Sequence, residues 1–224
     1  ARDGHDAFDS EYQNDPTASE YAPFHNSLHY WHTLPNNLLY FGACDPSLGK
    51  FGKQRDPSAI GIGGFDRENG ILYIVKMLIK KRLPDRIISD IIELQRQYMC
   101  IAWAIESVQF QEFLRTELVK RSAKMGVPVP AVPVHPHADK ELRIEALQPH
   151  CANGLILFHT EQTTVIDQFK HFPKGGHDDG CDCVEMLHKI AQQYGQIHQI
   201  QEIVIPEPNM YQMNFGGFGT FNNW

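Results

Sequence analysis

The stretch LLYFGACDPSLGKFGKQRDPSAIGIGGFDRENGILYIVKMLI, residues 38–79, contains three apolar runs separated by residues that favour turns. The runs cover 38–45, 58–66 and 70–79, and Gly, Pro and Asn lie between them. Apolar runs of this length with such boundaries are typical of buried strands. The short turn RENG joins the second run to the third, which predicts that these two strands are neighbours.

Downstream of this stretch, short apolar strands alternate with amphipathic helices. We expect helices over 83–98, 107–126, 138–150, 160–172 and 178–194, and strands over 101–106, 127–135 and 155–158. Three consecutive strands followed by alternating strands and helices predict an α/β fold, with a mixed central β-sheet flanked by helices on both faces.

Composition and charge restrict the function classes. Hydrophobic residues make up 42% of the 224 residues, and no apolar run approaches the roughly 20 residues of a membrane span, so we expect no membrane partner. The net charge of −7 would not attract a polyanion, so a nucleic-acid partner would require local basic patches or bridging metal ions. Five cysteines, an odd number, favour reduced thiols in an intracellular setting over a disulfide framework.

The two ends of the chain differ from its middle in composition. Residues 1–37 are polar with scattered aromatic side chains, which predicts a linker segment. Residues 38–202 form the expected single domain, and 203–224, rich in Gly and Asn, form an expected flexible tail. Because the chain opens on Ala1 and not on Met, we expect it to be part of a larger polypeptide.

Acidic residues lie where the predicted strands end and where the last helix starts. Asp45 ends the first strand, Glu106 ends the fourth, and Asp178, Asp179 and Asp182 open the last helix. Functional groups of open α/β sheets gather at the carboxyl ends of strands, and carboxylates held close together need a cation between them. Oxygen ligands favour Mg²⁺ or Mn²⁺, and two such ions can activate water for phosphodiester hydrolysis.

The expected arrangement gives each acid a place in this site. Asp45 bridges both ions, Glu106 holds one of them, and the helix acids hold the other. Asp179 and Asp182 are three residues apart on one helix face, and we favour Asp179 as the ligand with Asp182 behind it. Asp178 points elsewhere if the helix has already begun at that residue.

Two other interpretations of these acids stay open. An acid at a strand end is an ordinary turn residue, and Asp at a helix start is an ordinary cap. Zinc is a competing metal, with His177, Cys181, Cys183 and His188 as potential ligands. However, Cys-x-Cys without a second pair at fixed spacing is a weak zinc signal, and we expect the thiols to pack in the core.

Basic residues that could contact DNA phosphates form three groups. Most charges of this kind are simply solvated, but the Gly-rich loop beside Asp45 is the best candidate for touching phosphates. The candidates are Lys50, Lys53 and Arg55 in that loop, Lys80 and Lys81 after the third strand, and Lys140 and Arg143 on a later helix.

Together these motifs resemble the nuclease domain of bacteriophage large terminase subunits. The resemblance rests on GACDPS (42–47), WAIES (103–107), HDD (177–179), DAFDSEYQNDPT (6–17) and KELRIEALQPHCANGLILF (140–158), and it covers roughly residues 5–195. It implies an RNase H-like fold in which Asp45, Glu106 and one or both of Asp178 and Asp179 coordinate two Mg²⁺ or Mn²⁺ ions, with Asp182 as an auxiliary. Family members carry HDDLVDAL where this chain has HDDGCDCV, which leaves the choice among the aspartates open.

The resemblance also implies an activity and a setting. The protein would be an endonuclease that cuts concatemeric double-stranded viral DNA during genome packaging, with portal protein and the small terminase subunit as partners. It would act in the host cytoplasm and be absent from the mature virion. The N-terminal ATPase would be missing here, since no Walker motif occurs. The alternatives are another RNase H-like nuclease, of resolvase or transposase type, or a docking module with weak nuclease activity.

Overall fold

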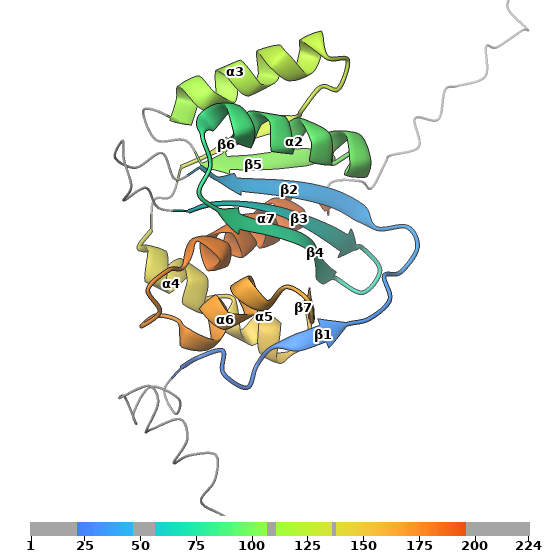
Figure 1. Cartoon of the computed structure of the whole chain (residues 1–224). Coiled ribbons are helices and arrows are strands. Elements are labelled where there is room, and N and C mark those ends of the chain that lie inside the picture. Colours follow the sequence, from blue (N-terminus) through green and yellow to red (C-terminus); the bar gives the residue numbers. More distant parts are fainter. Residues whose placement is uncertain (1–21, 47–56, 107–110, 136–137, 196–224) are drawn as a thin grey trace, which may run out of the picture.

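The computed structural model describes residues 22–46, 57–106, 111–135 and 138–195, which form one seven-stranded sheet with helices on both sides (Figure 1). The strand order is β1-β7-β4-β3-β2-β5-β6. β2, β3 and β4 form an antiparallel meander, whereas β5 and β6 on one side and β7 and β1 on the other are added by parallel pairing. The strands are β1 (His29–Trp31), β2 (Leu39–Asp45), β3 (Ser58–Asp66), β4 (Ile71–Lys80), β5 (Ala102–Glu106), β6 (Ala131–Val134) and β7 (Ile156–His159).

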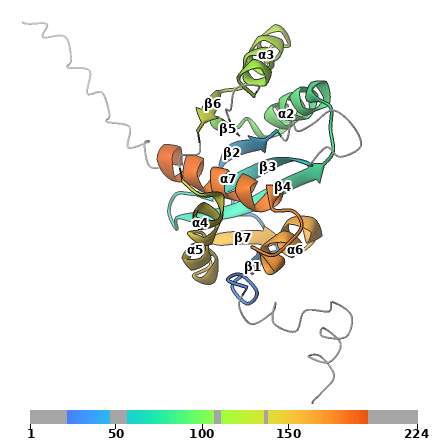
Figure 2. The same cartoon turned by 90° about the vertical axis from the view of Figure 1, so that its left-hand side faces the viewer.

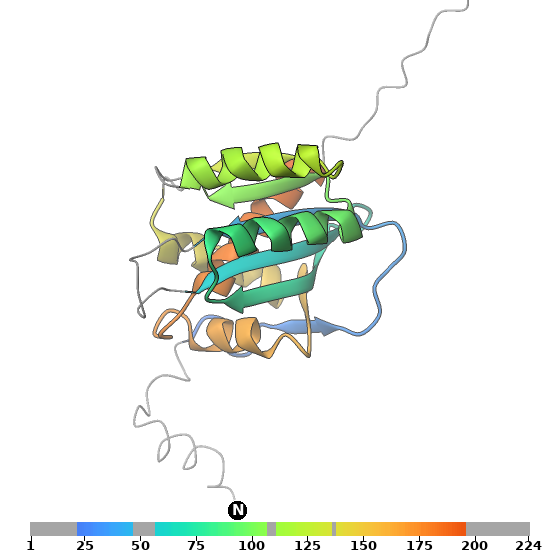
Figure 3. The same cartoon turned by 45° about the horizontal axis from the view of Figure 1, so that its top comes forward.

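The helices divide between the two faces of the sheet. α2 (Pro84–Tyr98) and α3 (Gln111–Lys124) lie side by side on one face, as Figure 3 shows. α7 (Asp179–Gly195) crosses the other face, and α4 (Lys140–Glu145), α5 (Gln148–Ala152) and α6 (Thr163–His171) lie on the same side (Figure 2). The predicted mixed sheet flanked by helices on both faces is therefore confirmed.

Alternating side chains on the central strands supply two separate cores. On β2, Phe41 and Ala43 face the core under α7, whereas Cys44 faces the core under α2. β5 follows the same period, with Ala102 and Ala104 towards α7 and its larger side chains towards α2. Small residues on the α7 side leave room for this helix to lie close to the sheet.

The predicted linker differs from the structure over residues 22–37. Phe24 is fully buried, and its ring packs edge-on against Phe169 at a centroid distance of 4.9 Å. His29–Trp31 forms β1 beside β7, and Trp31 Nε1 donates to the carbonyl oxygen of Ile74 at 3.1 Å. This segment is part of the domain because its aromatic side chains fill the core and the sheet edge. The rest of the predicted linker and the predicted tail lie outside the described residues.

The single helix predicted over 138–150 is two short helices. α4 ends at Glu145, and α5 begins at Gln148 with Pro149 in its first turn. Proline has no N–H to donate and suits only the first turn of a helix, so a new helix starts there. Within the described ranges, no helix is long and apolar enough to cross a membrane.

Candidate metal centre

Asp45 and Glu106 lie side by side because β2 and β5 are adjacent and parallel. The register pairs Ala43 with Ala104 and Cys44 with Ile105, so the next residue of each strand is the acid. Strand alternation places both acids on the α7 side of the sheet, like Ala43 and Ala104. Both strands end here, so this is the carboxyl-end edge at which the sequence predicted a site.

The third carboxylate comes from the first turns of α7. The helix starts at Asp179, and the N–H of Asp182 donates to the carbonyl oxygen of Asp178 at 3.0 Å. One carboxylate oxygen from each of Asp45, Glu106 and Asp182 lies within 4.8 Å of the others. Asp45 and Asp182 are buried, and Glu106 is half-buried. Asp178 and Asp179 are not members of this group, so the geometry favours Asp182 over the Asp179 that the sequence analysis preferred.

The absence of a side chain at Gly180 allows the start of α7 to pack closely against α6 and β4. Its N–H donates to Gln168 Oε1 on α6 at 2.8 Å. A Cβ at this position would lie 2.4 Å from that oxygen and 2.6 Å from Ile79 Cδ1. The departure from the family pattern noted at Gly180 therefore corresponds to a close approach of the helix backbone to α6 and β4.

Burial and the neighbouring carboxylates both disfavour the ionised form of Asp45. Burial, the charge of Glu106, a hydrogen bond with Glu106 and the charge of Asp182 raise the pKa of Asp45 from its ordinary value of 3.8 to about 8. Lys140 offsets part of this increase. At neutral pH the metal-free site therefore retains a proton on Asp45, which a bound cation would replace.

Two basic residues of α4 lie against the acids at the start of α7. Lys140 Nζ is 2.8 Å from Asp178 Oδ1 and 3.6 Å from Asp182 Oδ2. Arg143 places one terminal nitrogen 3.0 Å from Asp182 Oδ1 and the other 2.6 Å from Glu185 Oε2. Both residues were predicted to bind DNA, but here their charged groups are paired with carboxylates. This pairing could not be predicted from local sequence patterns, because Lys140 and Arg143 are 38 and 42 residues from their hydrogen-bond partners along the chain.

The other predicted DNA-binding residues fall into two groups. Lys80 and Lys81 are exposed at the end of β4, and the register of β2, β3 and β4 brings this end to the same edge as Asp45. Lys50, Lys53 and Arg55 lie outside the described residues.

The thiols beside the acids belong to the core. Cys181 and Cys183 are fully buried, and burial raises the pKa of both thiols. His177 is largely exposed, whereas the ring of His188 lies against the ring of His150 with centroids 4.3 Å apart and an interplanar angle of 50°. Burial and the neighbouring His150 lower the pKa of His188 to about 4. These four candidate zinc ligands thus have different surroundings.

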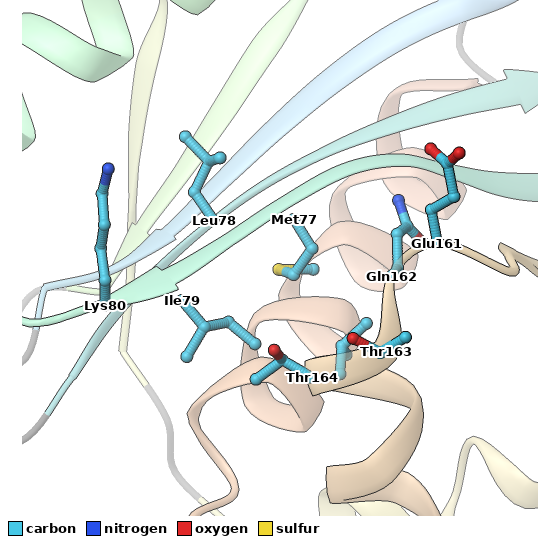
Figure 4. Close-up of a pocket in the computed structure, with 9 residues that line it drawn as sticks. Met77, Leu78, Ile79, Lys80, Glu161, Gln162, Thr163 and Thr164 are labelled. Atoms are coloured by element: carbon cyan, nitrogen blue, oxygen red, sulfur yellow. The ribbon is translucent and has the colours of Figure 1, made fainter.

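A pocket of about 220 Å³ between β4 and the start of α6 is separate from the carboxylates (Figure 4). Met77 and Ile79 point from β4 towards α6, while Thr163 and Thr164 line the opposite side. The three acids of the cluster do not line it. Its mostly neutral lining provides no group of catalytic acids, and we assign the candidate site to the cluster.

The cluster fits a hard divalent cation. Its donor set is carboxylate oxygen only, which suits Mg²⁺ or Mn²⁺ better than a soft metal. Three acids converge closely enough to share one ion. Burial and the neighbouring charges of Glu106 and Asp182 raise the pKa of Asp45, and Lys140 offsets only part of this increase.

Several solved structures of viral terminases are similar to this chain. Neither protein-family models nor curated proteins give a match to the chain. The nuclease domain of the P22 large terminase is similar with a TM-score of 0.53 and 14% identity, over 79% of this chain and 95% of that one. The human cytomegalovirus terminase nuclease domain gives 0.52 and 12%, over 75% and 91%.

The large terminase of the thermophilic bacteriophage D6E is also similar, with a TM-score of 0.53 and 14% identity over 75% of this chain. The matched region spans 44% of that longer protein. At these identities the likeness establishes the fold. The chain has the α/β fold of large-terminase nuclease domains, and the predicted RNase H-like fold is confirmed.

Proposed function

We propose that this chain is a metal-dependent endonuclease that cleaves double-stranded DNA. The observation that carries the proposal is the convergence of Asp45, Glu106 and Asp182 at the carboxyl-end edge of a terminase nuclease fold. The cytomegalovirus domain with the same fold is described as soaked with manganese, which supports Mn²⁺ or Mg²⁺ as the cofactor.

The acidic residues would have different roles as metal ligands. Asp45 would contact both ions of a two-ion site, while Glu106 and Asp182 would each hold one. Asp178 and Asp179 remain candidates for further ligands of the second ion. When bound, such ions lower the pKa of a water molecule and stabilise the leaving oxygen of a phosphodiester.

The DNA would lie along the edge that contains the cluster. Exposed Lys80 and Lys81 at this edge, and the loop with Lys50, Lys53 and Arg55, would contact phosphates. The substrate we propose is the concatemer of viral DNA cut during genome packaging in the host cytoplasm. Portal protein and the small terminase subunit are the proposed partners of the whole protein.

Cleavage of a supercoiled plasmid with Mn²⁺ tests the function and the choice of ligands together. Asp45→Asn, Glu106→Gln and Asp182→Asn should each reduce nicking at least about 100-fold, because loss of residues that merely support ligands already costs 10–100-fold. Asp179→Asn should have a smaller effect than Asp182→Asn. Asp167→Asn, at an exposed site on α6, is the matched control and should cut normally.

The outcomes separate the two parts of the proposal. Nicking retained by all three cluster variants, with circular dichroism showing intact folding, would overturn the proposed function. Nicking lost in Asp179→Asn but kept in Asp182→Asn would overturn the ligand assignment alone.

A further inference from the structure

Lys140 lies between the carboxylate cluster and Asp178, the residue that precedes α7. As the first residue of α4, it contacts Asp178 at 2.8 Å and Asp182 at 3.6 Å. Its charge also acts on Asp45, where it opposes the rise in pKa. One ammonium group therefore interacts with two members of the cluster and with a third acid beside it.

Arg143, one turn further along α4, is more buried than Lys140 and has more carboxylate contacts at short distance. Its side chain is 11% exposed, and its two terminal nitrogens face Asp182 and Glu185, which are themselves buried. A planar guanidinium held between two buried carboxylates is fixed in place. The Lys140 side chain is 38% exposed, and its flexible stem can turn the ammonium group towards solvent.

We propose that Lys140 is an internal counter-ion of the cluster, which competes with the divalent metal and, once displaced, binds a DNA phosphate. The inference rests on the proposed function, since it takes the cluster as the metal site. Without metal, the acids hold the ammonium group and reduce their own repulsion. A divalent ion would take over this role and repel the lysine from Asp182, and an ammonium group with three donors can then bind a second anionic partner besides Asp178.

The proposal makes metal binding and DNA binding interdependent through one side chain. Because coupling between two ligands is reciprocal, metal should strengthen DNA binding by the same factor by which DNA strengthens metal binding. Removing Lys140 should decrease this factor. Arg143 would keep its position in both states.

Calorimetric titration of the DNA-free protein with Mn²⁺ tests the competition. Lys140→Met should lower the dissociation constant for Mn²⁺ roughly threefold to tenfold, the size expected when a partly exposed cation near the site is removed. Lys140→Arg retains the charge and should bind Mn²⁺ like the wild type. Lys80→Met, which removes an exposed lysine at the same edge, should also leave the Mn²⁺ affinity unchanged.

Binding of a fluorescent DNA duplex tests whether metal binding releases Lys140 from the acids. The affinity is measured in EDTA and in Ca²⁺, with the latter chosen to occupy the site without rapid cleavage. Lys140→Met should weaken binding mainly in Ca²⁺, because in EDTA the acids already hold this lysine. Lys80→Met should weaken binding by a similar factor in both conditions.

The results distinguish this inference from the proposed function. If the wild type binds Mn²⁺, Asp182→Asn does not, and Lys140→Met binds with unchanged affinity, the counter-ion proposal is overturned and the metal site stands. Equal losses of DNA affinity in EDTA and Ca²⁺ for Lys140→Met would overturn the release step. If the wild type binds no Mn²⁺, the proposed function and this inference both fail.

Discussion

Two groups of buried charges, one against α2 and one against α7, are built in different ways. Against α2, the carboxylate of Asp90 receives the guanidinium of Arg82 at 2.8 Å on one oxygen and that of Arg86 at 2.8 Å on the other. Arg82 also donates to the carbonyl oxygen and the hydroxyl of Ser58. Against α7, three carboxylates meet with their oxygens within 4.8 Å.

The difference lies in charge balance. The acid on α2 is fully compensated by arginines, as expected of a group that supports the fold. Under α7, burial first and then the charges of Glu106 and Asp182 raise the pKa of Asp45 to about 8, and Lys140 offsets only part of this increase. Uncompensated charge at the end of a sheet costs stability and is typical of a binding site, whereas balanced charge is typical of structure.

The largest effect on stability should follow from removing one arginine from the Asp90 group. Arg82→Met leaves Asp90 buried with only Arg86, whose side chain is 63% exposed, as a partner. We expect the free energy of unfolding to fall by about 3–5 kcal/mol, as for other broken buried ion pairs. Urea denaturation monitored by circular dichroism measures this loss.

A double variant is the control for this prediction. Arg82→Met with Asp90→Leu removes both charges, and it should recover much of the loss because no unpaired buried carboxylate remains. If the double variant is no more stable than Arg82→Met, the charge is not the cause. The loss would then come from the donor contacts of Arg82 to Ser58 and the neighbouring carbonyl oxygens.

The two groups also differ in how much of them the sequence could predict. Asp45 and Glu106 could be placed because strand ends and strand alternation are local patterns. The grouping of Asp182, and not Asp179, with Asp45 and Glu106 could not be predicted from sequence, since it depends on the residue at which α7 begins and on how this helix packs. Which of the two aspartates binds metal stays a prediction. β1 was missed because three residues are too short to show a period. Its place is fixed by distant contacts such as that of Trp31 with Ile74.

A smaller change in stability, of opposite sign, should follow from removing one negative charge from the cluster of Asp45, Glu106 and Asp182. In metal-free protein the pKa of Asp45 is about 8, far above the value of 3.8 for an unperturbed carboxyl. Between these values the folded state binds a proton that the unfolded state does not, so stability falls as pH rises from about 4 to 8 and is lowest above 8. Asp45→Asn resembles the protonated carboxyl and cannot ionise.

Thermal melts of metal-free wild type and Asp45→Asn from pH 5 to pH 8.5 measure this effect. The variant should melt higher at pH 8.5 by a few degrees, on the order of 1 kcal/mol or more, and the difference should shrink towards pH 5. Asp167→Asn, which removes an exposed acid, should show no such trend. A difference that does not depend on pH would show that Asp45 is ionised like an ordinary carboxyl.

The smallest expected effect on stability comes from replacing Arg86, the exposed partner of Asp90. Arg86 contacts the same carboxylate as Arg82 and at the same distance of 2.8 Å, but it is one helical turn from Asp90 and mostly in solvent. Exposed pairs of this spacing contribute about 0.3–0.5 kcal/mol, so Arg86→Met should lower the free energy of unfolding by that amount. Because the two arginines contact one carboxylate at one distance, comparing their losses in urea denaturation measures the combined effect of burial and of the further contacts that Arg82 makes with Ser58 and neighbouring carbonyl oxygens. A loss for Arg86→Met close to that for Arg82→Met would contradict this prediction and would mean that Asp90 needs both charges.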